Sequence, residues 1–367
     1  MNFGHDEGLR LAPHEEVPPE RVEEVLEQLS SIRQDEIARQ ATLARKSANI
    51  GRKYRERLRN ALGSDAYDQY RSAVLSDRKF RRRDLDLPSH VRIDPSDRGI
   101  RGDEALRALE IDPEVIRRER RRAQDQFACL LPNPPEEDGQ WVEVLTPDQV
   151  PDEVKGRTIR SLQYFSPPYS DFAWGHDGYS DGAFTRSQSA GADNVTGFVR
   201  TSSLVENYNA DDYDSASTQA AGLVGFWYKV PTSGLLEVWI HVQVSVARHR
   251  LILVDEWGVS DSTTRQDNQI AFRAQGGGIF TQMRTSVGSG FYLHRDTSGV
   301  WNVENVTPGQ KYWAHLFSDV AFPAGTWVHV EVGTQTLTSE WTNDMQVTSG
   351  TDFRYFIPQA AVGSTGG

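Results

Sequence analysis

The sequence repeats one short pattern, in which a tryptophan is followed two positions later by a histidine. The pattern occurs four times, far more often than nine tryptophans and nine histidines among 367 residues would give by chance. Residues i and i+2 of a β-strand share one face of a sheet, so each pair would place an indole beside an imidazole. The four pairs are Trp174/His176, Trp239/His241, Trp313/His315 and Trp327/His329.

Two of these pairs lie in strictly alternating segments. In residues 235–246 Glu237, Trp239 and His241 alternate with Leu, Val and Ile, and in residues 327–332 Trp327, His329 and Glu331 alternate with valines. Such alternation is typical of a half-buried antiparallel strand. We therefore expect Trp239, His241, Trp327 and His329 to lie on the same side of one sheet.

A face of this composition is compatible with four roles. Exposed tryptophans usually mark a protein interface, which is the role we favour. The alternatives are ordinary core, a platform that stacks a sugar ring, and a metal site built from His241, His329, Glu237 and Glu331. The candidate binding residues are Trp239, His241, Trp327, His329, Glu237, Glu331, Trp313 and His315.

Acidic residues in a second segment could hold calcium through their oxygen atoms. Asp211, Asp212 and Asp214 supply carboxylates, but their spacing is not that of an EF-hand. A solvated acidic turn is the commoner outcome, so we expect no cofactor, with calcium as the alternative. Cys129 is the single cysteine, which excludes a disulfide scaffold and a cysteine zinc site.

The composition divides the chain into two parts. Residues 1–139 carry 26 Lys+Arg and 28 Asp+Glu, and 23 of these cations are arginine, whereas residues 140–367 carry 14 and 24 and contain all nine tryptophans. The Pro-rich acidic run at residues 132–139 cannot continue a helix and is typical of a spacer. We predict a flexible arm at 1–17, a helical assembly or anchoring domain at 18–131, a linker at 132–139 and a β-sandwich at 140–367.

The helical part shows a narrow apolar stripe. Val22, Val25, Leu29 and Ile32 follow at helical spacing after Pro18-Pro19, which favours a helix start there. Further helices are predicted at 50–62, 66–80 and 102–131, the last interrupted at Pro113, which suits the first turn of a new helix. A stripe this narrow favours packing on a partner over a free globular core.

Arginine clusters occur at residues 39–59, 78–83 and 117–122. Dense cations can neutralise phosphates, but aromatic residues are scarce in this part and its net charge is slightly negative. A protein partner or a solvated helix face is therefore favoured over nucleic acid.

Beyond residue 140 the period is two, with many short apolar segments separated by Gly and Pro turns. The pattern is typical of an antiparallel, jelly-roll-like β-sandwich. The predicted fold class is thus α + β and multidomain, with an Arg-rich helical arm before the sandwich.

Catalytic signatures such as Gly-x-Ser-x-Gly, His-Glu-x-x-His or a phosphate-binding loop are absent from the sequence. We expect a non-enzymatic structural component of a larger assembly, such as a phage virion or tail-like particle, which forms an oligomer with other protein subunits. The alternatives are a carbohydrate-binding, lectin-like protein and a glycan-cleaving enzyme with an unrecognised carboxylate pair. No apolar stretch spans a membrane and no signal peptide is evident, so we expect synthesis in the cytoplasm and incorporation into a particle.

Overall fold

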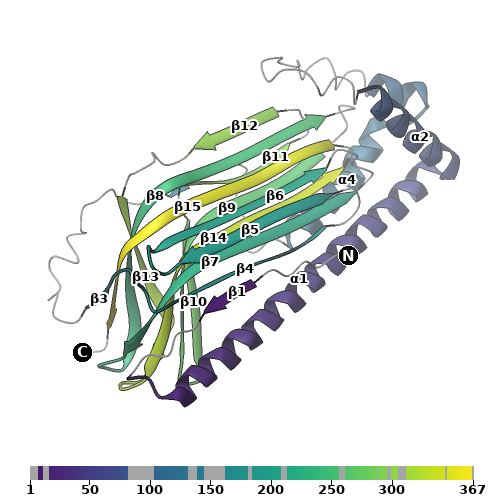
Figure 1. Cartoon of the computed structure of the whole chain (residues 1–367). Helices are drawn as coiled ribbons and strands as arrows, with labels where there is room; N and C mark the ends of the chain where they lie inside the picture. Colours follow the sequence, from purple (N-terminus) through teal and green to yellow (C-terminus); the bar gives the residue numbers. More distant parts are fainter. Residues whose placement is uncertain are drawn as a thin grey trace.

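The computed structural model describes residues 7–10, 16–81, 103–130, 139–143, 162–180, 184–207, 213–255, 261–286, 288–295, 299–304, 311–343 and 345–365. Two antiparallel β-sheets lie face to face, and a long helix runs along the outside of one of them (Figure 1). Among the described helices, none is both long enough and apolar enough to cross a membrane.

Helix α1 (Pro19–Leu62) is a single element of 44 residues, where the sequence predicted two. Pro19 begins it, as predicted. The helix continues through Gly51, where a Cβ atom would lie 2.3 Å from the ring of Tyr213, so the glycine lets the helix approach that ring. Gly63 follows the helix with φ +82°, a conformation that favours glycine.

Two shorter elements complete the helical layer. Helix α2 (Ser64–Arg81) follows Gly63 directly, close to its predicted bounds. Residues 103–108 are helical, and α4 (Pro113–Ala128) begins after Asp112, whose side chain accepts a hydrogen bond from Glu114 N at 3.0 Å. The predicted interruption at Pro113 is confirmed.

Among the described residues, sheet A has eight strands in the order β1-β4-β7-β14-β9-β11-β2, with β10 on β9. Their bounds are β1 Glu7–Arg10, β2 Gly139–Glu143, β4 Asp171–Ser180, β7 Asp214–Lys229, β9 Asp261–Gly276, β10 Ile279–Ser286, β11 Gly288–Arg295 and β14 Trp327–Asn343. Residues 7–10 lie within the segment predicted to be a flexible arm, but they form strand β1, which pairs with β4 at the edge of the sheet.

Sheet B has seven strands in the described residues, in the order β12-β8-β15-β6-β5, with β13 on β8 and β3 on β15. Their bounds are β3 Gln163–Phe165, β5 Thr185–Asp193, β6 Phe198–Asn207, β8 Gly234–Asp255, β12 Gly299–Glu304, β13 Lys311–Phe322 and β15 Met345–Ser364. The antiparallel sandwich is as predicted at this level, and jelly-roll connectivity stays a prediction.

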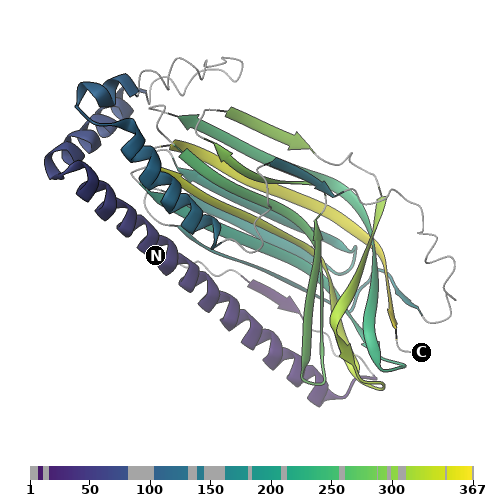
Figure 2. The ribbon, with the colours of Figure 1, turned by 180° about the vertical axis from the view of Figure 1, so that it is seen from behind.

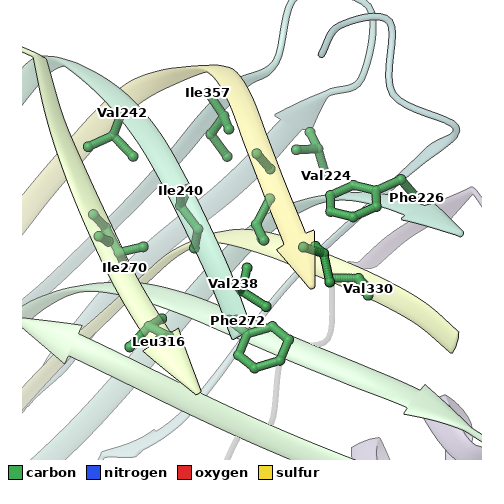
Figure 3. Packing of buried hydrophobic residues seen from close by; sticks show 14 of the residues in the cluster. Val224, Phe226, Val238, Ile240, Val242, Ile270, Phe272, Leu316, Val330 and Ile357 are labelled. Carbon is green, nitrogen blue, oxygen red and sulfur yellow. The ribbon is translucent and has the colours of Figure 1, made fainter. Parts of the chain in front are cut away.

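One half of the sandwich interior is apolar. Val224, Phe272 and Val330 of sheet A pack against Val238 and Ile240 of sheet B (Figure 3). The alternation predicted for β8 holds from Leu236 to Val244. It fails at Val246, which is only half-buried, because the pairing register with β15 shifts there and Ala247 takes the inner position.

The other half of the interior is polar. Thr334 of β14 hydrogen-bonds Thr201 of β6 at 3.3 Å, and Gln266 of β9 donates to Ser349 of β15 at 2.8 Å. Glu340 of β14 is fully buried in the same layer. The Thr201–Thr334 and Gln266–Ser349 contacts connect the two sheets, and hydroxyl groups of β9 hydrogen-bond Glu340.

Helices α1 and α4 lie against the outer face of sheet A, and α1 runs along the direction of its strands (Figures 1 and 2). Near its start α1 packs Val25 on Trp227. Near its end Tyr54 and Leu58 join Phe127 of α4 and Trp341 of β14 in a second apolar cluster. The predicted narrow apolar stripe of α1 therefore packs on sheet A of the same chain.

Candidate binding surfaces on the two sheets

Two of the Trp-x-His pairs form one ladder on the outer face of sheet B. Strands β8 and β13 are paired so that Trp239 lies opposite His315, and His241 opposite Trp313. The Trp239 and His315 rings stack with their centres 3.6 Å apart and 11° between planes, and the His241 and Trp313 rings stack at 4.6 Å and 8°. One face of each ring is thus covered by its cross-strand partner.

Glu237 holds one end of this ladder. Its Oε1 accepts a hydrogen bond from Trp239 Nε1–H at 3.1 Å and another from His315 Nε2–H at 2.9 Å. Trp239 is 3% exposed, so its ring has no free face for a sugar. The ladder anchors β13 on β8 and leaves His315 and Trp313 half-buried at the surface.

Exposed rings lie elsewhere on the same face. Phe356 of β15 is 38% exposed and contacts Phe198 of β6, with 5.0 Å between ring centres. Tyr164 of β3 is 46% exposed. Their neighbours Tyr355 and Phe165 point into the core, so alternation puts Phe356 and Tyr164 on the outer side. We did not predict these residues; the alternation of Phe356 with Tyr355 and Ile357 was the available signal.

The other predicted pair lies on the opposite side of the molecule. Trp327 and His329 belong to β14 of sheet A. Val328 and Val330, which alternate with them along the strand, point into the core, so Trp327 and His329 point outward, toward α1. The expectation that Trp239 and Trp327 share one sheet face is therefore wrong. Alternation assigns residues to the two faces of one strand, but β8 and β14 lie in different sheets.

His329 and a carboxylate form a buried ion pair beneath α1. His329 Nε2 lies 2.9 and 3.0 Å from the two carboxylate oxygens of Asp171 of β4. The intervening strand carries Gly225, where a Cβ atom would lie 1.9 Å from Asp171 Oδ1. Glycine at that position is what lets the two side chains meet across the strand.

The surroundings of His329 favour its charged form. Burial acts to lower the pKa of His329, but the carboxylates of Asp171 and Glu331 outweigh it and the pKa is raised. Gln275 Nε2 lies 3.2 Å from Nδ1, the other ring nitrogen. Burial raises the pKa of Glu331, against the attraction of His329 and Arg273.

The predicted ligand set for a metal is not brought together. His241 and Glu237 lie on sheet B, whereas His329 and Glu331 lie on sheet A. In the described part of the chain no group of three or more His, Cys, Asp or Glu side chains is arranged to hold a metal ion. The remaining pair, Trp174/His176, lies on β4 between β1 and β7, where His176 Nδ1 is 3.3 Å from Gln188 of β5.

The calcium candidates are only partly within the described residues. Asp214 is buried, and its carboxylate accepts a hydrogen bond from Asn207 at 3.0 Å. Asp211 and Asp212 lie outside the described residues. A calcium site at this segment stays a prediction.

Comparisons with known proteins give no family. No protein-family model matches the chain, and no curated protein matches it. The solved structures that it resembles include the enzymatically active domain of bacteriophage CBA120 tailspike protein 4, with 7% identity over 46% of this chain and 19% of that one and a TM-score of 0.14.

Two further structures are carbohydrate proteins by their descriptions. TmCBM61 in complex with β-1,4-galactotriose has 9% identity over 44% of this chain and 86% of that one, with a TM-score of 0.12. Isomalto-dextranase of Arthrobacter globiformis T6 complexed with panose has 11% identity over 61% of this chain and 42% of that one, with a TM-score of 0.14. With TM-scores this low, none of the three establishes a shared fold or a function.

Proposed function

We propose that the protein is a non-enzymatic structural component of a larger assembly, such as a phage virion or tail-like particle. In this proposal the helical layer contacts neighbouring protein subunits and the outer face of sheet B is displayed. The charge distribution along α1 is the observation that carries the proposal.

The outward side chains of α1 are divided by charge. Its N-terminal half exposes mainly acids and its C-terminal half mainly cations: Glu20, Glu23, Glu27 and Asp35, then Arg45, Lys46, Arg52, Lys53 and Arg59. The exposed Arg21, Arg39 and Glu56 run against this division, and two of them, Arg21 and Glu56, pair with an opposite charge one turn away. The helix spans about 66 Å at 1.5 Å per residue, so two such surfaces can oppose each other's charges over a long contact.

Salt dependence of self-association tests the proposal. We expect light scattering coupled to size-exclusion chromatography to show species larger than the monomer at low salt, which shrink at high salt because exposed charge pairs are screened. Arg52→Glu combined with Lys53→Glu should abolish these species, whereas Lys311→Glu, an exposed cation of sheet B, should leave them unchanged. A chain that is monomeric at every salt and protein concentration, and that binds no other particle subunit, would contradict it.

Glycan binding is the second candidate, favoured by the exposed rings of Phe356 and Tyr164. Exposed aromatic faces can stack on the apolar side of a sugar ring. If this surface binds glycans, a glycan array should give signals that are lost in Phe356→Ala and Tyr164→Ala and retained in Val195→Ala, which removes an exposed apolar side chain elsewhere. An array without signals would remove this candidate.

A further inference from the structure

A cavity of about 570 Å³ lies between α1 and the outer face of sheet A. Leu29, Ile32 and Ile37 of α1 line it from one side, and Ala173 of β4 and Ala221 of β7 line it from the other. A volume of this size is ordinary for small-ligand sites, which occupy roughly 300–1,000 Å³.

The cavity exists because the sheet carries small residues where the helix passes over it. In the strand register Gly175 lies beside Ala221, and Ala173 lies beside Leu223, whose other neighbour is Gly333. The helix is held away from this patch by the two apolar clusters at its ends, around Trp227 and around Trp341. The small side chains therefore leave space that neither element fills.

At one end of the cavity lies a guanidinium group with an N–H that donates to no described residue. Arg273 of β9 lines the cavity, and its Nε has no hydrogen-bond partner among the described residues although that atom is buried. Its nearest ionic partner is Glu36 of α1, at 3.8 Å, which is long for a charge-assisted hydrogen bond.

Further cations stand beside this end. Arg284 of β10 is exposed, yet desolvation by the surrounding protein, with repulsion from Arg273 and Arg39, lowers its pKa to about 10. Glu36 and Asp267 are the acids that offset this repulsion, and Asp267 is already paired with Arg265 at 2.8 Å. Among the described residues, Arg39, Arg273 and Arg284 therefore face two carboxylates that are not paired with Arg265: Glu36, and Glu331, whose pKa burial raises.

We propose that the cavity binds an amphipathic carboxylate, with its apolar chain along Leu29, Ile32 and Ala221 and its carboxylate on Arg273. A fully polar anion would leave the apolar lining unused. A neutral apolar molecule would leave the Arg273 Nε–H unpaired. A cation would meet Arg273 at this end, and the two acids of the lining already face cations, Glu36 facing Arg273 and Asp177 facing Arg186.

The test is titration calorimetry of the full chain with decanoate below its micelle concentration. We expect one saturable site, with decanoate binding at least about tenfold more tightly than 1-decanol, because a charge-assisted hydrogen bond is lost in the alcohol. Decyltrimethylammonium should not bind. Equal affinity for decanoate and decanol, many weak sites, or no binding would overturn the proposal.

Three variants locate the site. Arg273→Gln should weaken decanoate binding about tenfold and leave decanol binding unchanged, whereas Arg354→Gln, an exposed arginine of sheet B, should change neither. Ala221→Leu should abolish binding of both ligands by filling the cavity. Ser30→Phe on the exposed surface of α1 is a second blocking variant that leaves the sheet intact, so a folding defect in Ala221→Leu does not decide the outcome. Binding that survives both blocking variants would place the ligand elsewhere.

Discussion

Glu340 is a carboxyl group inside the polar half of the sandwich, surrounded by hydroxyl groups. Thr264 Oγ1 lies 2.9 and 2.7 Å from its two oxygens, and Ser262 Oγ lies within hydrogen-bond distance of Oε1. Burial raises the pKa of Glu340 to about 8, although these hydrogen bonds act to lower it. The folded protein therefore holds a proton on Glu340 at neutral pH.

This proton makes stability depend on pH. An unfolded glutamate titrates near pH 4.5, so between about pH 4.5 and 8 the folded state binds more protons than the unfolded state, and stability falls as pH rises. His249, whose pKa burial lowers to about 4, is half protonated in the unfolded chain at pH 6.5, so its titration raises stability by about 0.4 kcal/mol between pH 6.5 and 8, opposite to the effect of Glu340. From pH 6.5 to 8 we expect Glu340 to cost the native chain roughly 1–2 kcal/mol of unfolding free energy.

Urea denaturation at pH 6.5 and pH 8 measures this slope. In Glu340→Gln, residue 340 is neutral at both pH values. The variant should therefore lose the pH dependence of the unfolding free energy that comes from Glu340 and keep any contribution from His329. Glu27→Gln, an exposed acid of α1, is the control and should keep the native slope. Equal slopes for the native chain and Glu340→Gln would show that Glu340 is ionised in the folded protein.

At the scale of elements, α1 depends on a few buried side chains near its start. Val25 is 1% exposed and packs on Trp227, whereas its neighbour Leu26 is 36% exposed. Val25→Ala should cost roughly 1–3 kcal/mol of unfolding free energy, because it removes two methyl groups from a packed contact. Leu26→Ala should change it by about 0.5 kcal/mol or less.

Hydrogen exchange of α1 distinguishes local from global effects of these variants. With Val25→Ala, amides in the first half of α1 should exchange faster than those near Tyr54, which are held by the second cluster. Similar exchange in Val25→Ala and Leu26→Ala would mean that the contact with Trp227 does not hold the helix.

At the scale of the whole molecule, the helices and the sandwich share buried clusters. Trp341 of β14 is fully buried against Phe127 of α4 and Tyr213, and Ser47 of α1 hydrogen-bonds Ser215 at 2.6 Å. The linker predicted at residues 132–139 lies almost entirely outside the described residues, and the division into domains stays a prediction.

These contacts predict the behaviour of a chain cut in the linker. We expect limited proteolysis at residues 132–139 to give two fragments that stay together in size-exclusion chromatography and separate only in denaturant, because the shared clusters bury apolar surface from both. Trp341→Ala should weaken the association of the cut fragments. Fragments that separate in native buffer would show that the two parts fold independently.

Local sequence patterns were sufficient to predict which segments form many of the helices and strands. Pro18-Pro19 and Pro113 marked the starts of α1 and α4, since proline suits the first helical turn. The alternation of valines predicted the inward faces of β8 and β14. The Trp-x-His spacing also placed each ring and imidazole on one strand face, as Trp239 and His241 confirm.

The pairing and packing of those elements could not be predicted from local sequence patterns. That β8 pairs with β13 and β14 with β7 depends on contacts between residues distant in sequence, so the stacking of Trp239 on His315 and the separation of Trp239 from Trp327 emerge only in the folded chain. The same holds for the Asp171–His329 pair, the burial of Glu340 and the space above Ala221. By itself the sequence determined which side chains share a strand or helix face, because that follows from local backbone geometry; the tertiary structure decided what each face meets, because that depends on strand pairing and packing across the whole chain.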